Sequence, residues 1–325
     1  PPSPHPPLSL APCSSDESYK YIFLPLCFSL TFFFSLTLNS IVLVRPCRRY
    51  GGCCHGNAPR RWTTPLIYMV NLATTDLMYG LSLPFLVASY VLRDHWVFGD
   101  FMCRLVCFLF YFNLYCSIFF LTCISVQHYL GICHPMRTIT LESKRAVKGT
   151  CAMVWVVMFV LNCPIFRFAQ TGYEAFVNCW DDAIDKEFAD YVPYGLVLHL
   201  LGFFVPFIII AWCYSQVVRT IFRTLRRKSI KTIVTITLLF ALCFLPFHVT
   251  RTLFLLLRRG QMGGCNAMKT ISICYKVTRP LASCNAWLNA LLYFLTGDKS
   301  DPCCDTHVDI KCSWIFSVLP ELTGI

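Results

Sequence analysis

Seven long apolar stretches recur along the chain, and they constrain its fold more than any other feature. Each is about the 20 residues or more that an α-helix needs to cross a bilayer. They lie at about residues 21–44, 65–91, 101–126, 147–166, 192–218, 230–257 and 269–295. A buried helix of a soluble protein can imitate one such stretch, but seven separated by short polar links favour a membrane protein. The sequence therefore predicts an all-α bundle of seven transmembrane helices.

The charge of the chain has two readings, and its distribution decides between them. The formal net charge of +11 would suit a nucleic-acid interface. However, the basic residues gather in the links after the first, third and fifth stretches, and the acidic ones gather in the opposite links. Cytoplasmic loops are enriched in Lys and Arg. The pattern thus predicts an extracellular N-terminus and a lipid bilayer as partner, with no nucleic acid.

Three parts follow from this topology. Residues 1–20 begin with a Pro-rich run and are expected to be a disordered extracellular tail. Residues 21–298 form the transmembrane domain. Residues 299–325 form a cytoplasmic tail, in which no amphipathic basic helix is predicted.

The chain has 21 cysteines, which are too many to pair by count alone. Lasting disulfides form only on the outer side of the membrane. Four cysteines stand at outer positions, and we predict the pairs Cys103–Cys179 and Cys13–Cys265. The cysteines of the cytosolic links are expected to be reduced.

Polar side chains inside the apolar stretches are costly in lipid, so they mark either function or helix packing. One group is predicted near the middle of the membrane, on the first, second, third and seventh spans. Its members are Asn39, Asp76, Ser117, Asn285 and Asn289. A hydrogen-bonded packing cluster is the alternative to an ion site here.

A second group is basic and stands at the outer ends of the last two spans. His248 and Arg251 share one face of their helix by their spacing, and Lys276 and Arg279 repeat that spacing. Such a cluster repels itself in a low dielectric unless an anion is bound, and Arg suits phosphate. A polyphosphate ligand is therefore predicted. The alternative is that the two arginines reach the interface or pair with the acidic loop at residues 181–185.

Several motifs resemble those of the rhodopsin-like receptor family. They are Asn39, Asn71-Leu-Ala-x-x-Asp76, Trp155, Pro206, Tyr214 and Phe240-x-x-Cys-Phe-Leu-Pro246. Four further runs resemble the purinergic nucleotide receptors: Asp94-His-Trp-x-Phe-Gly-Asp100, Tyr129-Leu-Gly-Ile-Cys-His-Pro135, Phe247-His-x-Thr-Arg251 and Tyr275-Lys-Val-Thr-Arg-Pro-Leu-Ala-Ser283. The resemblance implies a plasma-membrane receptor for uridine or adenine nucleotides. Signalling through a heterotrimeric G protein to phospholipase C and calcium is implied with it.

The resemblance also implies roles for individual residues. Phosphates would meet Arg251, Lys276 and Arg279, and the sugar or base would lie near Tyr111, Tyr115 and His248. The polar group around Asp76 would hold a sodium ion, and no other metal or cofactor is expected. Contact with the G protein would involve His128, Tyr129, Tyr214 and Tyr293.

Three positions depart from the family pattern. Cys107 stands where these receptors usually carry an Arg, His128 replaces the Arg of the Asp-Arg-Tyr signature, and Ala290 replaces a Pro. A non-signalling decoy or decayed receptor copy is therefore the main alternative, and a receptor for a carboxylate or lipid is a lesser one. An enzyme is not predicted, because no Ser-His-Asp or paired-carboxylate arrangement stands out.

Overall fold

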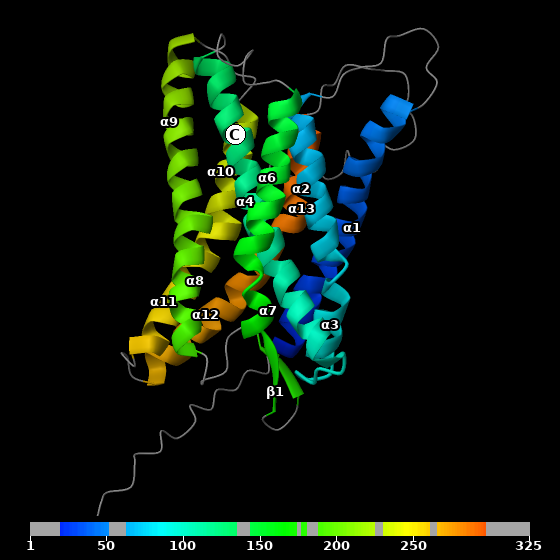
Figure 1. The fold of residues 1–325 in the computed structure, drawn as a ribbon, viewed down its shortest axis with the longest axis vertical. Coiled ribbons are helices and arrows are strands. Elements are labelled where there is room, and N and C mark those ends of the chain that lie inside the picture. Colours follow the sequence, from blue (N-terminus) through cyan, green and yellow to red (C-terminus); the bar gives the residue numbers. More distant parts are fainter. Residues whose placement is uncertain are drawn as a thin grey trace, which may run out of the picture. The chain divides into compact units, whose positions relative to one another are not determined.

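A computed structural model describes residues 20–51, 63–134, 144–173, 177–180, 188–224, 230–260 and 265–296. These residues form seven helical rods and one short hairpin (Figure 1). The rods are α1 (Lys20–Gly51), α2 with α3 (Thr64–Gly80, Leu83–Val91), α4 (Gly99–Cys133), α6 with α7 (Lys144–Asn162, Ile165–Phe168), α8 with η1 and α9 (Phe188–His199, Leu200–Phe204, Val205–Thr224), α10 with η2 and α11 (Ile230–Leu239, Phe240–Phe244, Leu245–Gly260), and α12 with α13 (Cys265–Ser283, Asn285–Thr296). Each rod contains one of the seven predicted spans.

Six of the rods are long and apolar enough to cross a membrane by length and composition. The seventh, α12 with α13, is long enough but carries Lys269, Lys276 and Arg279 in its first part. Apolar side chains also cover the outer faces of the rods: Phe33, Val156 and Ile208 are each more than 60% exposed. In water such a surface would be unstable, but it suits contact with lipid.

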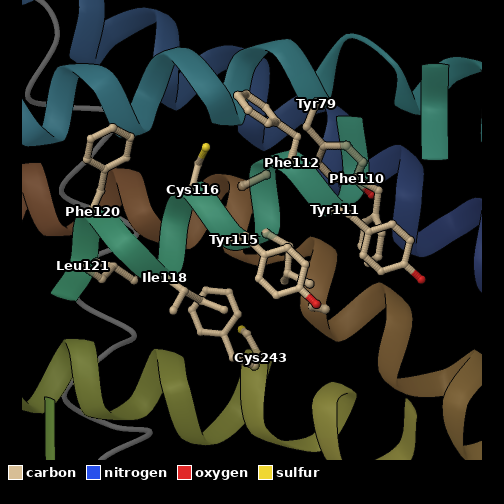
Figure 2. Packing of buried hydrophobic residues seen from close by; sticks show 14 of the residues in the cluster. Tyr79, Phe110, Tyr111, Phe112, Tyr115, Cys116, Ile118, Phe120, Leu121 and Cys243 are labelled. Atoms are coloured by element: carbon tan, nitrogen blue, oxygen red, sulfur yellow. The ribbon is translucent and has the colours of Figure 1, made fainter. Parts of the chain in front are cut away.

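Helix α4 lies at the centre of the bundle, against α2, α6 and α9. Its side chains are buried on every side, as Figure 2 shows for the stretch from Phe110 to Leu121. A helix that is apolar all round is expected to be a central one. Functional side chains on α4 can therefore reach several neighbouring rods.

Prolines accompany interruptions in several of the rods, including the fifth, sixth and seventh. Pro206 and Pro246 each follow a π-helical turn, η1 and η2, that contains the residue four positions earlier. Proline clashes with the carbonyl at that position and offers no N–H, and the wider turn accommodates both effects. In the seventh rod Pro280 lies within α12, and the helix is interrupted at Cys284. Helix α13 continues through Ala290, the position at which the family usually has a Pro, without a break. The irregularity of this rod therefore lies one turn after Pro280 and not at residue 290.

A two-stranded antiparallel hairpin, β1 (Gln170–Tyr173) and β2 (Val177–Trp180), follows the fourth rod. Thr171 lies opposite Cys179, and both strands contact α4. The sequence analysis treated this segment only as an acidic loop. Strands of four residues are too short to show a clear alternation of apolar and polar side chains.

Candidate functional site

Asp76 lies at the centre of a buried polar cluster. Its carboxylate accepts hydrogen bonds from Asn113 Nδ2 at 2.7 Å, Asn289 Nδ2 at 3.1 Å and Ser117 Oγ at 3.4 Å. All four side chains are at most 2% exposed. Donors from the third and seventh rods thus converge on a carboxylate of the second rod.

Two members of the predicted polar group do not touch this carboxylate. Asn39 donates to the backbone carbonyls of Ser35 and Ala286, at 3.0 and 2.6 Å. Asn285 is buried, and its Oδ1 accepts no hydrogen bond from the described part of the chain. Of the predicted five, Ser117 and Asn289 bond the Asp76 carboxylate, whereas Asn39 lies beside them and joins the first and seventh rods through backbone atoms.

Asn113 was not predicted, although it makes the shortest hydrogen bond to Asp76. It stands four residues before Ser117, which places both side chains on one face of α4. That spacing was the signal available in the sequence.

The predicted basic cluster begins with Arg251, which is completely buried. Its Nη2 donates to the hydroxyl of Tyr191 at 2.6 Å. The guanidinium also lies over the ring of Tyr275, 4.7 Å from the centroid, with Tyr191 and Phe254 slightly farther away. Three aromatic rings on three rods thus surround this charge, which is a favourable cation–π environment.

Arg279 is held in a similar way on the neighbouring rod. Its guanidinium lies 5.0 Å from the ring centroid of Phe110 on α4. Lys276, one turn earlier on α12, is half-buried. The predicted pairing of these residues with the acidic loop lies outside the described residues, because the loop at 181–187 is not among them.

A hydrogen bond fixes the register between the two basic helices. Thr250 Oγ1 on α11 and Thr278 Oγ1 on α12 are 2.8 Å apart. Each threonine immediately precedes one of the arginines, so this bond holds Arg251 and Arg279 at a similar depth. The bond thereby sets the relative height of the two arginines for which the family resemblance implies contact with phosphate.

Tyr111, Tyr115 and His248 form a continuous aromatic surface beside the arginines. The two tyrosine rings are nearly parallel, with centroids 6.5 Å apart, and their hydroxyls point to the same side in Figure 2. Tyr115 then contacts the ring of His248 at 5.7 Å. His248 is fully buried, and neither of its ring nitrogens is hydrogen-bonded within the described residues.

His199 on α8 was not predicted as part of this surface. Its ring lies edge-on to His248, with centroids 5.0 Å apart, and its Nδ1 is 3.0 Å from Thr252 Oγ1. Tyr191 was also missed, although it bonds Arg251. Both residues come from the rod after the acidic loop, where a single His in an apolar stretch was the available signal.

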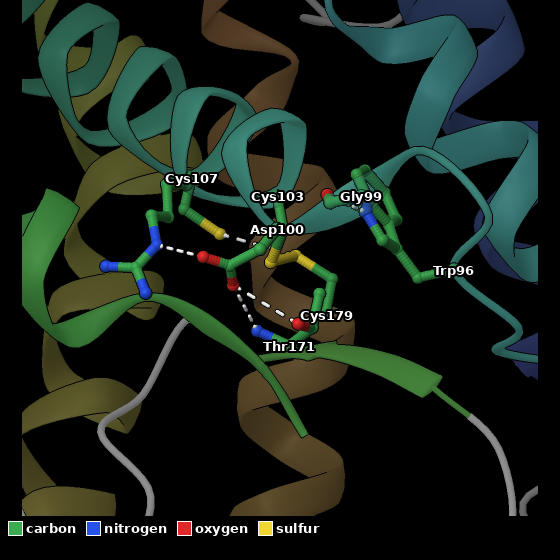
Figure 3. Close-up of a disulfide and its surroundings, with 8 residues drawn as sticks. Trp96, Gly99, Asp100, Cys103, Cys107, Thr171 and Cys179 are labelled. Atoms are coloured by element: carbon green, nitrogen blue, oxygen red, sulfur yellow. Dashed lines mark hydrogen bonds and ion pairs between the residues drawn. A yellow bond between two sulfur atoms is a disulfide. The ribbon is translucent and has the colours of Figure 1, made fainter. Parts of the chain in front are cut away.

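Asp100 connects α4 to the hairpin through Thr171 (Figure 3), and Arg104 connects α4 to the end of the fourth rod. Asp100 Oδ1 accepts hydrogen bonds from the backbone N and Oγ1 of Thr171, at 2.9 and 3.2 Å. Its Oδ2 forms an ion pair of 2.5 Å with Arg104 Nε, and Arg104 Nη1 donates to the carbonyl of Phe166. Arg104 is therefore engaged in holding the loop and does not replace the Arg that is missing at Cys107.

The predicted disulfide Cys103–Cys179 is confirmed, with the two Cα atoms 5.5 Å apart. It joins the N-terminal part of α4 to β2. The predicted pair Cys13–Cys265 lies outside the described residues, since Cys13 and the side chain of Cys265 are not among them.

At the other end of the bundle lie the residues expected to contact a G protein. Tyr214 Oη is 2.7 Å from Ser125 Oγ, and Tyr129 Oη is 3.0 Å from His134 Nε2. His128 is half-buried, and its Nε2 has no hydrogen-bond partner in the part of the chain that the structure describes. Tyr293 packs edge-on against Phe294. Tyr214 of the fifth rod therefore has a polar partner on the third rod, and Tyr129 has one in His134 just after that rod, whereas the His128 Nε2 has none within the described residues.

Comparison with known proteins agrees with this architecture. The sequence profile of the family described as "7 transmembrane receptor (rhodopsin family)" matches residues 56–293. P2Y purinoceptor 4 of Rattus norvegicus is 40% identical over 296 residues, which cover 88% of this chain and 79% of the relative. P2Y purinoceptor 2 of Rattus norvegicus is 38% identical over 298 residues, 88% of this chain and 77% of the relative. P2Y purinoceptor 3 of Meleagris gallopavo is 37% identical over 301 residues, 88% of each. The chain therefore belongs to the rhodopsin family of seven-transmembrane receptors and, within it, to the P2Y purinoceptors, so it is a multi-pass membrane protein.

Proposed function

We propose that this protein is a plasma-membrane receptor that binds an extracellular nucleoside di- or triphosphate and signals through a heterotrimeric G protein. The observation that carries the proposal is the alignment of Arg251 and Arg279 by the Thr250–Thr278 hydrogen bond. Two guanidinium groups at one depth suit a polyphosphate, because each can bind phosphate oxygens in a bidentate manner. Similarity to several P2Y purinoceptors supports the same ligand class.

The base and sugar would contact the aromatic surface formed by Tyr111, Tyr115 and His248. Ring faces offer stacking area to any base, and the unbonded ring nitrogens of His248 offer one donor and one acceptor. The ligand must displace the guanidinium of Arg251 from its aromatic surroundings to reach it, since Arg251 is fully buried. Lys276 would add a third positive charge near the phosphates. In this proposal the chain binds its ligand and performs no chemical step on it.

Calcium release in cells that express the chain tests this function. We would compare UDP, UTP, ADP and ATP on the wild type and on Arg251→Ala and Arg279→Ala, with Arg259→Ala as a matched control. Arg259 lies on the same helix as Arg251 but is exposed. A response that is lost in the first two variants and kept in the third supports the proposal. A wild type that reaches the surface but neither binds nor responds to any of the four nucleotides contradicts it.

A decoy that binds nucleotide without signalling is a second candidate. The observation in its favour is His128, which stands at the position of the signature Arg and whose Nε2 is buried without a hydrogen bond among the described residues. His128→Arg separates the two functions, when it is compared with the wild type for nucleotide binding and calcium release. Binding without signalling in the wild type, with signalling gained in the variant, identifies a decoy limited by this one contact.

A sodium ion at Asp76 is also proposed, as a stabiliser of the resting receptor. The donor chemistry fits, because the site combines a carboxylate, the hydroxyl of Ser117 and the buried Oδ1 of Asn289, which has no hydrogen bond among the described residues. Agonist affinity is then expected to fall as NaCl replaces a bulky organic cation at constant ionic strength. Asp76→Asn should abolish that dependence, and an equal sodium effect in the variant would contradict the site.

The proposed topology places the N-terminus outside the cell, as the basic links predict. An epitope tag at the N-terminus should be accessible to antibody on intact cells. A tag that requires permeabilisation would contradict this orientation.

A further inference from the structure

Three sulfur atoms lie together at the outer end of α4. Cys103 and Cys107 are four residues apart on this helix, so their side chains share one face, and Cys179 faces them from β2 (Figure 3). All three Sγ atoms lie within 4.8 Å of one another. Cys103 and Cys179 form the disulfide, and the Cys107 thiol lies 3.9 Å from Cys179 Sγ. A reduced thiol is thus in contact with a disulfide.

This arrangement places the reactants of a thiol–disulfide exchange next to one another. In such an exchange a thiolate attacks one sulfur of a disulfide and the other sulfur leaves. Effective concentrations are high when both groups are held within one site. Cys107 is 2% exposed and Cys103 is fully buried, which favours exchange between them over reaction with external thiols.

We propose that Cys179 has two alternative partners and that the receptor interconverts between a Cys103–Cys179 and a Cys107–Cys179 disulfide. The Cys107 thiolate attacks Cys179 Sγ, the Cys107–Cys179 bond forms, and the Cys103–Cys179 bond breaks. Cys103 leaves as a thiolate and takes up a proton in place of the one that Cys107 released. One thiol and one disulfide are present before and after, so the step needs no oxidant or reductant.

The three sulfurs form a triangle, not a line. The Cys107 sulfur therefore does not lie on the extension of the Cys103–Cys179 bond, opposite the leaving Cys103 sulfur. The Cys179 side chain must rotate before the Cys107 thiolate can attack from that direction. Cys179 lies on a two-stranded hairpin and is only partly buried, so the surrounding packing leaves it more freedom than the two cysteines on α4 have.

The two isomers would place the hairpin differently. Cys107 is one helical turn deeper than Cys103, and four residues correspond to about 6 Å along the helix axis. The hydrogen bonds from Thr171 to Asp100 hold the hairpin at the level of Cys103. Formation of the deeper disulfide must strain or break these hydrogen bonds and draw β2 along α4 towards Cys107.

Trypsin distinguishes the isomers, because Arg104 lies between the two candidate cysteines. Cleavage after Arg and Lys gives one peptide with Cys103, residues 94–104, and another with Cys107, residues 105–137. Cys179 is in the peptide 168–186. Thiols on intact cells are blocked with N-ethylmaleimide before solubilisation, and the cross-linked peptides are identified by mass spectrometry without reduction.

In the full-length wild type we expect peptide 168–186 joined to both partners, in proportions that a glutathione redox buffer does not change, because both isomers hold one thiol and one disulfide. Cys103→Ser should retain a disulfide through Cys107 and still reach the cell surface. Cys107→Ser should show only the link to 94–104, and the double variant should lose both the link and surface expression. Fragmentation must assign the link in 105–137 to Cys107 rather than to its other cysteines.

Two results would overturn the proposal independently of each other. One is a surface-expressed Cys103→Ser variant in which Cys179 is alkylated. The other needs no variant: a wild type that shows only the link to 94–104, even after incubation in the redox buffer. Neither result depends on whether a nucleotide binds, so failure of this inference is distinguishable from failure of the proposed function.

Discussion

The carboxylate of Asp76 and the guanidinium of Arg251 are both fully buried, yet different neighbours surround them. Asp76 accepts hydrogen bonds from side chains on the third and seventh rods. Arg251 donates to a tyrosine hydroxyl and lies over aromatic rings. A hydrogen bond to a charged group contributes about 1.5–3 kcal/mol, whereas a cation–π contact contributes about 0.5–2 kcal/mol and is less directional. We therefore expect the hydrogen bonds to Asp76 to stabilise the fold. The aromatic contacts of Arg251, in contrast, can be replaced by contacts with a ligand.

Removal of the Asp76 carboxylate is the strongest way to test this difference. Asp76→Ala leaves three buried donors without their acceptor, and we expect a loss of about 3–5 kcal/mol of stability. The thermal midpoint of the purified receptor in detergent measures it. Asp76→Asn, which keeps the volume and one acceptor oxygen, should lose less. Equal midpoints for wild type and Asp76→Ala would show that the cluster does not stabilise the fold.

Arg251→Met should have the opposite profile. The Met side chain fills much of the same space, so the unliganded stability should change by less than about 1 kcal/mol, since buried charges can often be replaced in this way. Loss of about 3 kcal/mol of charge-assisted binding would lower nucleotide potency roughly 100-fold. Potency and thermal midpoint are both measured, with Arg259→Met as the control. A large loss of stability with unchanged nucleotide potency would show that Arg251 stabilises the fold and does not bind the ligand.

Gly202 tests the packing of the fifth rod against Tyr115, which belongs to the aromatic surface beside Arg251. A Cβ at this position would lie 2.5 Å from a ring carbon of Tyr115, so Gly202→Ala must displace the aromatic surface. Overpacking of this kind costs about 1–3 kcal/mol. Gly149→Ala on α6 is the matched control, because its new methyl group meets no atom within 4 Å. The control should be neutral or stabilising by up to about 1 kcal/mol, and a common direction for both variants would contradict the packing argument.

The smallest effect is expected at the ion pair between Lys20 and Asp94, whose Nζ and Oδ2 atoms are 2.5 Å apart. Both side chains are partly exposed to solvent. Pairs of this kind contribute about 1 kcal/mol or less and are screened by salt. Asp94→Asn should lower the thermal midpoint slightly at low ionic strength and not at all in concentrated NaCl. An effect as large as that of Asp76→Ala would show that the outer pair is as structural as the buried cluster.

Much of this architecture could be predicted because a lipid-spanning helix needs a long apolar run, which is a local property of sequence. Compartment reduced the candidate cysteines to four, and the predicted Cys103–Cys179 pair among them is the one that the structure confirms. The polar contacts were harder, because they depend on which helix faces meet. Asn113 and Asn39 differ little as sequence signals, yet one bonds Asp76 and the other bonds backbone carbonyls.

The aromatic surroundings of Arg251 could not be predicted for the same reason. Tyr191, Phe254 and Tyr275 are far apart in sequence, and only the packing of three rods brings them around one guanidinium. The basic spacing on α11 and α12 predicted which charges share a face. It did not predict that Thr250 and Thr278 align the two helices.

The two π-helical turns have a consequence for how these rods tolerate changes in length. A π turn holds one residue more than an α turn. The helical segments before and after it therefore keep the same faces towards the core although the chain carries one extra residue between them. Deletion of one residue within Leu200–Phe204 or Phe240–Phe244 can convert the turn to regular α-helix and leave both flanking faces in place. The same deletion one turn away in the sixth rod would rotate part of that rod by about 100° and move His248 or Arg251 away from its aromatic neighbours. Single-residue deletions in the fifth and sixth rods should therefore be tolerated better within these two turns than elsewhere in the same rods.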